Sequence, residues 1–245
     1  KNQPLHICAS EIGRTNAKSS TTTKGNEEHP HALEPNVFKS CRTVVLSSAK
    51  NYWRSSEELL RCLRSSMNVP GVAGPMTDLK HLDDREDVEK PGLLVDGFVF
   101  EPFALRPAVA DGITDVVVLR SRPDGVEILG KKTGVYHKLI VPNFFKSNQM
   151  PEGAIVLGKN RSDMLHYAED ILSMNEAART GNPVDIGPVQ GLQDLQEVNR
   201  ASICTVACSE STPEHATLNT KGEDLNTALR RGYASCFLTL ASPTQ

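Results

Sequence analysis

A short apolar run that ends in an Asp-Gly pair constrains the fold of this chain most strongly. Leu93 to Val95 are aliphatic and lead directly into Asp96-Gly97, and a second apolar run covers Val116 to Leu119. An aliphatic run that stops at Asp-Gly is typical of a buried strand that ends in a tight turn. In open α/β sheets, ligands bind at the carboxyl ends of the strands. The pattern therefore predicts a carboxylate at such an edge, although Asp-Gly is also a common turn dipeptide without any further role.

The segments before Asp96 predict two strands and a helix. Pro4 to Ser10 and Arg42 to Ser48 are rich in apolar and β-branched residues, as strands are. The helix is expected to begin after Ser55, because Glu58 follows at capping-box spacing and an apolar stripe of leucines continues to Met67. A Pro/Gly-rich loop over residues 68–75 should end it.

The segments after Asp96 predict a compact parallel βαβ unit. A short helix over Arg106 to Ala110 is closed by Asp111-Gly112, and a buried strand over Asp115 to Leu119 follows. Farther along, the patterns predict helices over 136–145, 162–178 and 225–240, a strand over 203–207 and a linker over 181–191.

This order of elements predicts an α/β chain in two parts. Residues 1–125 are expected to form one α/β unit, and residues 126–245 an appended α/β extension. Residues 15–39 are rich in Ser, Thr, Lys and Asn, and residues 78–90 are strongly charged, so both are expected to be flexible insertions at the surface.

Composition excludes several classes of protein. The chain has 245 residues, of which 38% are apolar, and its 27 basic side chains face 30 acidic ones, so a nucleic-acid partner is not expected. No apolar stretch is long enough to span a bilayer, and the polar start does not look like a signal peptide. Six scattered cysteines fit a reducing, intracellular setting. A start at Lys1 followed at once by a strand predicts a fragment of a longer protein.

Motifs for the common catalytic classes do not occur in the 245 residues. We find no Gly-x-Ser-x-Gly elbow, no phosphate-binding P-loop, no Gly-x-Gly-x-x-Gly and no His-Glu-x-x-His. The seven histidines do not cluster, so the sequence predicts neither a metal site nor a cofactor. Asp96 is the remaining candidate for a catalytic side chain.

The succession of segments resembles the C-terminal half of a patatin-like phospholipase domain. The resemblance is carried by the helix that ends in a Pro-Gly loop, by Asp96-Gly97 and by the strand and helix segments that follow, and it covers residues 5–122 best. It implies a three-layer α/β/α sheet and a lipid acyl hydrolase that acts on phospholipids or acylglycerols, with peripheral membrane contact. Asp96 would be the partner of a serine nucleophile in a two-residue dyad.

Two features set this chain apart from that family. The serine of the dyad would lie before residue 1, so the chain alone should be inactive, and Phe98 stands where the family has Gly or Ala. A catalytically inactive module that binds lipid or a protein partner is therefore the alternative interpretation. A nucleotide-binding domain is a weaker one, because no Gly-rich phosphate loop follows a strand.

Overall fold

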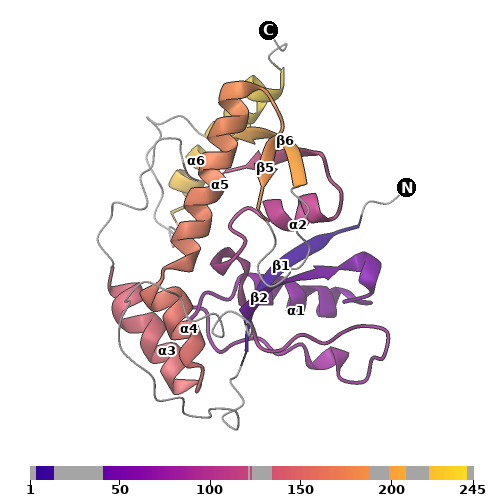
Figure 1. Ribbon diagram of the computed structural model, residues 1–245, viewed down its shortest axis with the longest axis vertical. Helices are drawn as coiled ribbons and strands as arrows, with labels where there is room; N and C mark the ends of the chain where they lie inside the picture. Colours follow the sequence, from indigo (N-terminus) through magenta and orange to yellow (C-terminus); the bar gives the residue numbers. More distant parts are fainter. Residues whose placement is uncertain are drawn as a thin grey trace, which may run out of the picture.

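The chain is a mixed α/β protein with two three-stranded sheets, seen here in a computed structural model (Figure 1). The structure describes residues 4–13, 41–120, 122, 134–187, 199–207 and 221–241. In chain order the elements are β1 (His6–Ile12), β2 (Cys41–Ser47), η2 (Ser48–Lys50), α1 (Ser56–Ser66), η3 (Lys80–Leu82), β3 (Leu94–Asp96), η4 (Gly97–Val99), α2 (Leu105–Ala110), β4 (Asp115–Leu119), η5 (Tyr136–Ile140), α3 (Val141–Ser147), α4 (Pro151–Gly153), η6 (Ala154–Lys159), α5 (Ser162–Thr180), β5 (Val184–Ile186), β6 (Asn199–Val206) and α6 (Gly222–Ala241). The segments η2 to η4 are 3₁₀ turns, whereas η5 and η6 are π-helical.

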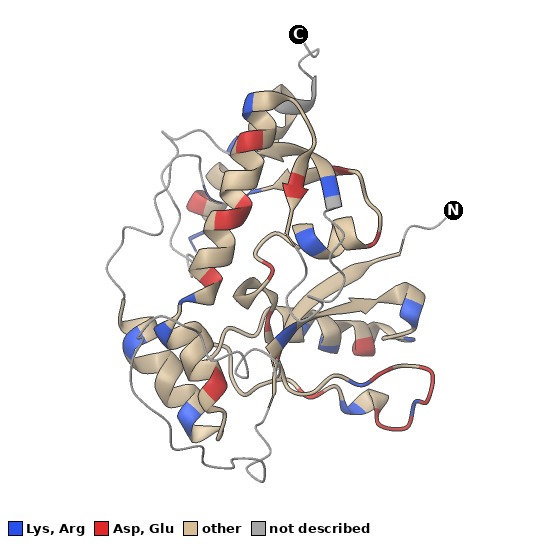
Figure 2. Ribbon diagram, viewed as in Figure 1, with Lys and Arg blue, Asp and Glu red and all other residues tan. Residues whose placement is uncertain are grey.

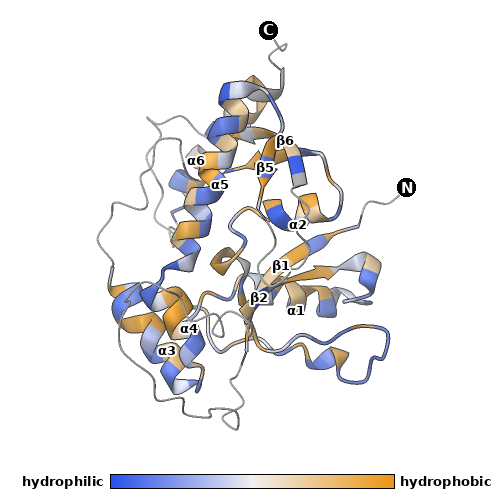
Figure 3. Ribbon diagram, viewed as in Figure 1, coloured by the Kyte–Doolittle hydropathy of each residue, from blue (hydrophilic) through white to orange (hydrophobic). Residues whose placement is uncertain are grey.

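The first sheet has the strand order β2-β1-β3, and β1 is antiparallel to both neighbours. Ala9 on β1 pairs with Val44 on one side and with Asp96 on the other. Helix α1 packs on this sheet through Cys62, in a core that includes Leu46 and Leu94. Figure 3 shows that the strands of this sheet carry mostly apolar residues, as their buried positions require.

The second sheet has the order β4-β6-β5, with β4 parallel and β5 antiparallel to β6. Helices α2 and α5 pack against it, because Leu105 and Met174 share a buried core with Val118. A third core lies between η4 and the helices η5 to η6, where Phe100 and Phe145 are fully buried. The long helix α5 lies beside β5 and β6 in Figure 1, and its Tyr167 also contacts Phe98 of η4.

The prediction of a parallel βαβ unit is wrong. β3 and β4 belong to different sheets, and the parallel neighbour of β4 is β6 rather than β3. The order strand, helix, strand leaves open which sheet each strand joins, since that depends on contacts between distant segments. The expected burial of β4 also fails, because Val117 and Leu119 are exposed and Val118 alone is buried.

The predicted helices are confirmed. α1 begins after its N-cap Ser55, α2 ends at Asp111 beside the left-handed Gly112, and α5 and α6 cover the expected ranges. The expected linker over 181–191 contains β5, and the helical segment over 151–159 was not predicted. The boundary predicted at residue 125 falls between β4 and β6, which are neighbours in one sheet.

The charged segment over 78–90 is packed more closely than its composition predicts. Leu79, Leu82 and Val88 are buried in the core beneath the first sheet. Its charged side chains form ion pairs with neighbouring elements, such as Arg85 with Glu58 of α1. The other predicted insertion, residues 15–39, lies outside the described residues.

Candidate functional site

Asp96 is the last residue of β3, and backbone hydrogen bonds hold it on both sides. It pairs with Ala9 of β1, and its N–H donates to the carbonyl oxygen of Asn68 at 3.0 Å. Asn68 is the first residue of the predicted Pro/Gly-rich loop, and its side-chain amide donates to Pro75 and Thr77. The loop after α1 therefore positions the strand end that carries Asp96.

The carboxylate of Asp96 is half-buried and oriented by its own turn. Its Oδ1 accepts a hydrogen bond from the backbone N–H of Phe98 at 2.8 Å, which makes Asp96 the N-cap of η4. Burial raises the pKa of this carboxyl, and the Phe98 hydrogen bond partly opposes that shift. A carboxylate with a raised pKa binds a proton more readily than a solvated one, as a general base must.

Gly97 brings three elements together directly behind Asp96. A Cβ at this position would overlap the carbonyl oxygen of Cys8 on β1. The same carbonyl accepts a hydrogen bond from Ser66 Oγ of α1 at 2.5 Å. The Asp-Gly pair thus meets a steric demand as well as a turn preference, because only glycine lets η4 approach β1 this closely.

Phe98 contributes to an aromatic group that links this turn to α5. Its ring lies 5.9 Å from the ring of Tyr167, which also contacts Phe103 at 5.1 Å. The guanidinium carbon of Arg122 lies 5.1 Å from the Tyr167 ring centre and 5.9 Å from that of Phe98. Phe98 therefore packs between the Asp96 turn and α5.

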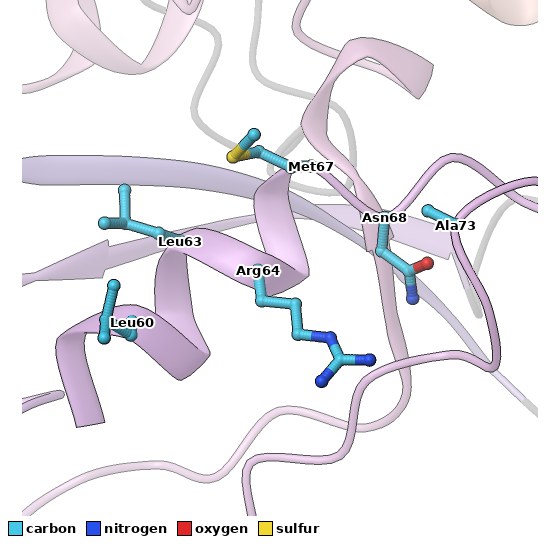
Figure 4. A pocket seen from close by; sticks show the side chains of 6 residues that line it. All are labelled: Leu60, Leu63, Arg64, Met67, Asn68 and Ala73. Atoms are coloured by element: carbon cyan, nitrogen blue, oxygen red, sulfur yellow. The ribbon is translucent and has the colours of Figure 1, made fainter. Parts of the chain in front are cut away.

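An apolar groove is lined by residues of α1 and of the loop that follows it (Figure 4). The leucine stripe predicted for the core is divided there, since Leu60 and Met67 remain 64% and 70% exposed. Asn68, which lines the groove, accepts a hydrogen bond from the N–H of Asp96 through its carbonyl oxygen. Its lining residues are Leu60, Leu63, Arg64, Met67, Asn68 and Ala73.

A buried group of charges between the two sheets was not predicted from the sequence. Arg106 of α2 lies between Glu101 and Asp170, with its Nη1 3.7 Å from Glu101 Oε2 and 2.8 Å from Asp170 Oδ1. Burial raises the pKa of Glu101 to about 8 and that of Asp170 to about 6, against the opposing effect of Arg106. Spacing could have indicated Asp170, because it shares the buried face of α5 with Tyr167 and Met174.

A second buried acid–base pair lies in the helices over 136–163. His137 Nε2 is 3.0 Å from Asp163 Oδ2, and both residues are buried. Tyr136 packs edge-on against the His137 ring at 5.0 Å. Burial raises the pKa of the Tyr136 hydroxyl, with smaller contributions from the charges of Asp163 and Asp96, so this tyrosine remains protonated at neutral pH.

Comparisons of the chain with protein-family models, curated proteins and solved structures give no match. Within the described ranges, no three His, Cys, Asp or Glu side chains are grouped as metal ligands. Across those same ranges, no helix has both the length and the apolar character needed to cross a membrane.

Proposed function

We propose that this chain supplies the aspartate of a Ser–Asp dyad in a lipid acyl hydrolase of the patatin-like type. The observation that carries the proposal is Asp96, which is held at the end of a buried strand with a half-buried carboxylate. In the proposed reaction a serine hydroxyl attacks the ester carbonyl of a phospholipid or acylglycerol, and Asp96 accepts the hydroxyl proton. Asp96 then gives this proton to the alcohol oxygen of the departing lysophospholipid or glyceride as the acyl-enzyme forms. Water attacks the acyl-enzyme after losing a proton to Asp96, which releases the fatty acid and returns the proton to the serine.

Two further features support a lipid substrate. The groove on α1 offers apolar side chains at the surface, and one of its lining residues, Asn68, accepts a hydrogen bond from the backbone N–H of Asp96. A fatty acyl chain would bury Leu60 and Met67, which are otherwise exposed to water. The serine and the donors that would stabilise the oxyanion belong, in this proposal, to a polypeptide segment beyond the 245 residues.

The test uses a protein that contains this chain together with the segment that, in this proposal, carries the serine. We expect the longer protein to hydrolyse a short-chain p-nitrophenyl ester and a phospholipid, and we expect Asp96→Asn to reduce kcat by about three orders of magnitude or more, as loss of a catalytic member does. Asp111→Asn is the matched control, because Asp111-Gly112 is a second Asp-Gly pair that ends a helix at the surface. Full activity in Asp96→Asn, with both variants folded, would refute the role of Asp96.

A catalytically inactive binding module is the second candidate, and Phe98 favours it. A large ring stands two residues from the carboxylate and is fixed against Tyr167, where a dyad enzyme of this type has a small residue. Binding of phospholipid vesicles without ester hydrolysis, unchanged by Asp96→Asn, would support this alternative.

A further inference from the structure

A buried contact between α5 and the segment that hydrogen-bonds to the first sheet contains more carboxyl groups than guanidinium groups. Its buried members are Glu101, Arg106 and Asp170. The carboxylate of Glu101 accepts a hydrogen bond from Thr43 Oγ1 of β2 at 3.3 Å and lies near the Arg106 guanidinium. Arg106 also pairs with Asp170 and with Glu169 Oε2, which is 3.1 Å from its Nη2. One guanidinium thus faces three carboxyl groups, two of which have fully or almost fully buried side chains. Figure 2 shows the acidic residues that α5 contributes.

The hydrogen bonding of this group is incomplete when both buried acids are ionised. Glu101 Oε2 and Asp170 Oδ2 are buried atoms that have no hydrogen-bond partner in the described part of the chain. Two buried carboxylates would exceed the single positive charge of Arg106, which is costly in a protein interior. A proton on one carboxyl removes the excess charge.

Glu101 is the acid that should hold this proton. Its side chain is completely buried, it lies farther from Arg106 than Asp170 does, and Asp170 takes the shorter ion pair. The pKa of Glu101, about 8, is accordingly higher than that of Asp170, about 6.

Other titratable groups near this contact belong to β1 and α5. On β1 the charge of Glu101 acts on Cys8, whose thiol pKa is raised to about 12 mainly by burial. The groups on α5 are His166 and Glu169, and burial lowers the pKa of His166. Arg122 lies over Tyr167 on the far side of the aromatic group. Arg106, with its Nη1 3.7 Å from Glu101 Oε2, is the base that forms an ion pair with Glu101.

We propose that a proton on Glu101 holds α5 against η4 and the residues that follow it, and that this contact opens more often as the pH rises above neutral. When the contact opens, Glu101 becomes solvated and releases the proton, so that opening is favoured by a lower proton concentration. The opening equilibrium should therefore increase about tenfold per pH unit between pH 6 and 8, and should level off above pH 8 where the closed state has also lost the proton.

This contact lies beside Asp96, which gives it a consequence for the candidate site. Tyr167 of α5 packs against Phe98, two residues after Asp96 and three before Glu101. Opening between α5 and η4 would remove this ring from the turn. The inference itself does not depend on any hydrolase activity, because it concerns the contact alone.

Hydrogen exchange of the full chain at pH 6 to 9, corrected for the intrinsic pH dependence of exchange, tests the proposal. In the wild type, protection of α2 and of the first half of α5 should fall about tenfold per pH unit up to pH 8 and then become constant. Glu101→Gln keeps the shape and is always neutral, so its protection should lose the tenfold decrease per pH unit that the wild type shows up to pH 8. Glu169→Gln removes the charge of an exposed carboxyl that pairs with the same arginine. Its dependence of protection on pH should match that of the wild type.

An unchanged slope in Glu101→Gln would overturn the proposal. Should that variant fail to fold, the carboxyl of Glu101 can be followed directly in the wild type by carbon NMR. A titration midpoint near 8 is expected, and a midpoint near 4.5, the ordinary value for a glutamate, would equally overturn it.

Discussion

A methyl group on Gly97 would overlap the backbone of β1, which makes this residue a sharp test of how the Asp96 turn is held. The atom it would meet is a backbone carbonyl oxygen, that of Cys8, which cannot rotate away as a side chain can. We predict that Gly97→Ala lowers the free energy of unfolding by about 2 kcal/mol, within the usual range for an overpacked core. Denaturant unfolding monitored by circular dichroism measures the change.

Gly134→Ala is the control for this substitution. Gly134 has no atom within 4 Å of the position a Cβ would take, so its variant should stay within about 0.5 kcal/mol of the wild type. Equal stability of the two variants would contradict the close approach between η4 and β1.

Helix α1 shows how much of an element the sequence can specify. Ser55 was predicted as its N-cap, and the structure has Ser55 Oγ accepting a hydrogen bond from the N–H of Glu58 at 3.2 Å. We predict that Ser55→Ala lowers the free energy of unfolding by about 1 kcal/mol, the typical cost of losing such a cap. Ser56→Ala alters a neighbouring exposed serine with no cap role, and a loss as large as that of Ser55→Ala would contradict the assignment.

The elements themselves were largely predictable, whereas their partners were not. Helical periodicity and end signals located α1, α2, α5 and α6, because these signals lie within each segment. The pairing of β4 with β6 joins residues 115–119 to 202–206, and no local pattern specifies so distant a contact. For the same reason the apolar β-branched run of β4 did not reveal that most of it is exposed.

The candidate site was predictable to a similar degree. Asp96 could be located because an apolar run ending at Asp-Gly is a local signal, and the structure places it at the end of β3. Glu101, Arg106 and Asp170 each resemble solvent-exposed charges in sequence. They become a buried group only when the segment after β3 and helix α5 meet.

The buried charges also connect the two sheets of the whole molecule, and Arg106 is the residue on which that connection depends. Arg106→Met keeps the aliphatic part of the side chain but leaves the carboxylate of Asp170 buried without its counter-charge. We predict a loss of about 3 kcal/mol in the free energy of unfolding at pH 7, as for other buried ion pairs from which one partner is removed.

The pH dependence of that loss follows from the pKa of Asp170. The folded-state value is raised to about 6, above that of an unfolded aspartate, so Asp170 is largely protonated in the native state at pH 5. A neutral carboxyl needs no counter-charge, and the loss caused by Arg106→Met should therefore be smaller at pH 5 than at pH 7. Arg179→Met removes an exposed arginine that pairs with Glu176 on the same helix and should change stability by less than about 0.5 kcal/mol at either pH. Urea unfolding of the wild type and of both variants at pH 5 and pH 7 measures these differences. If Arg106→Met loses the same free energy of unfolding at both pH values, the buried charges do not hold the two sheets together.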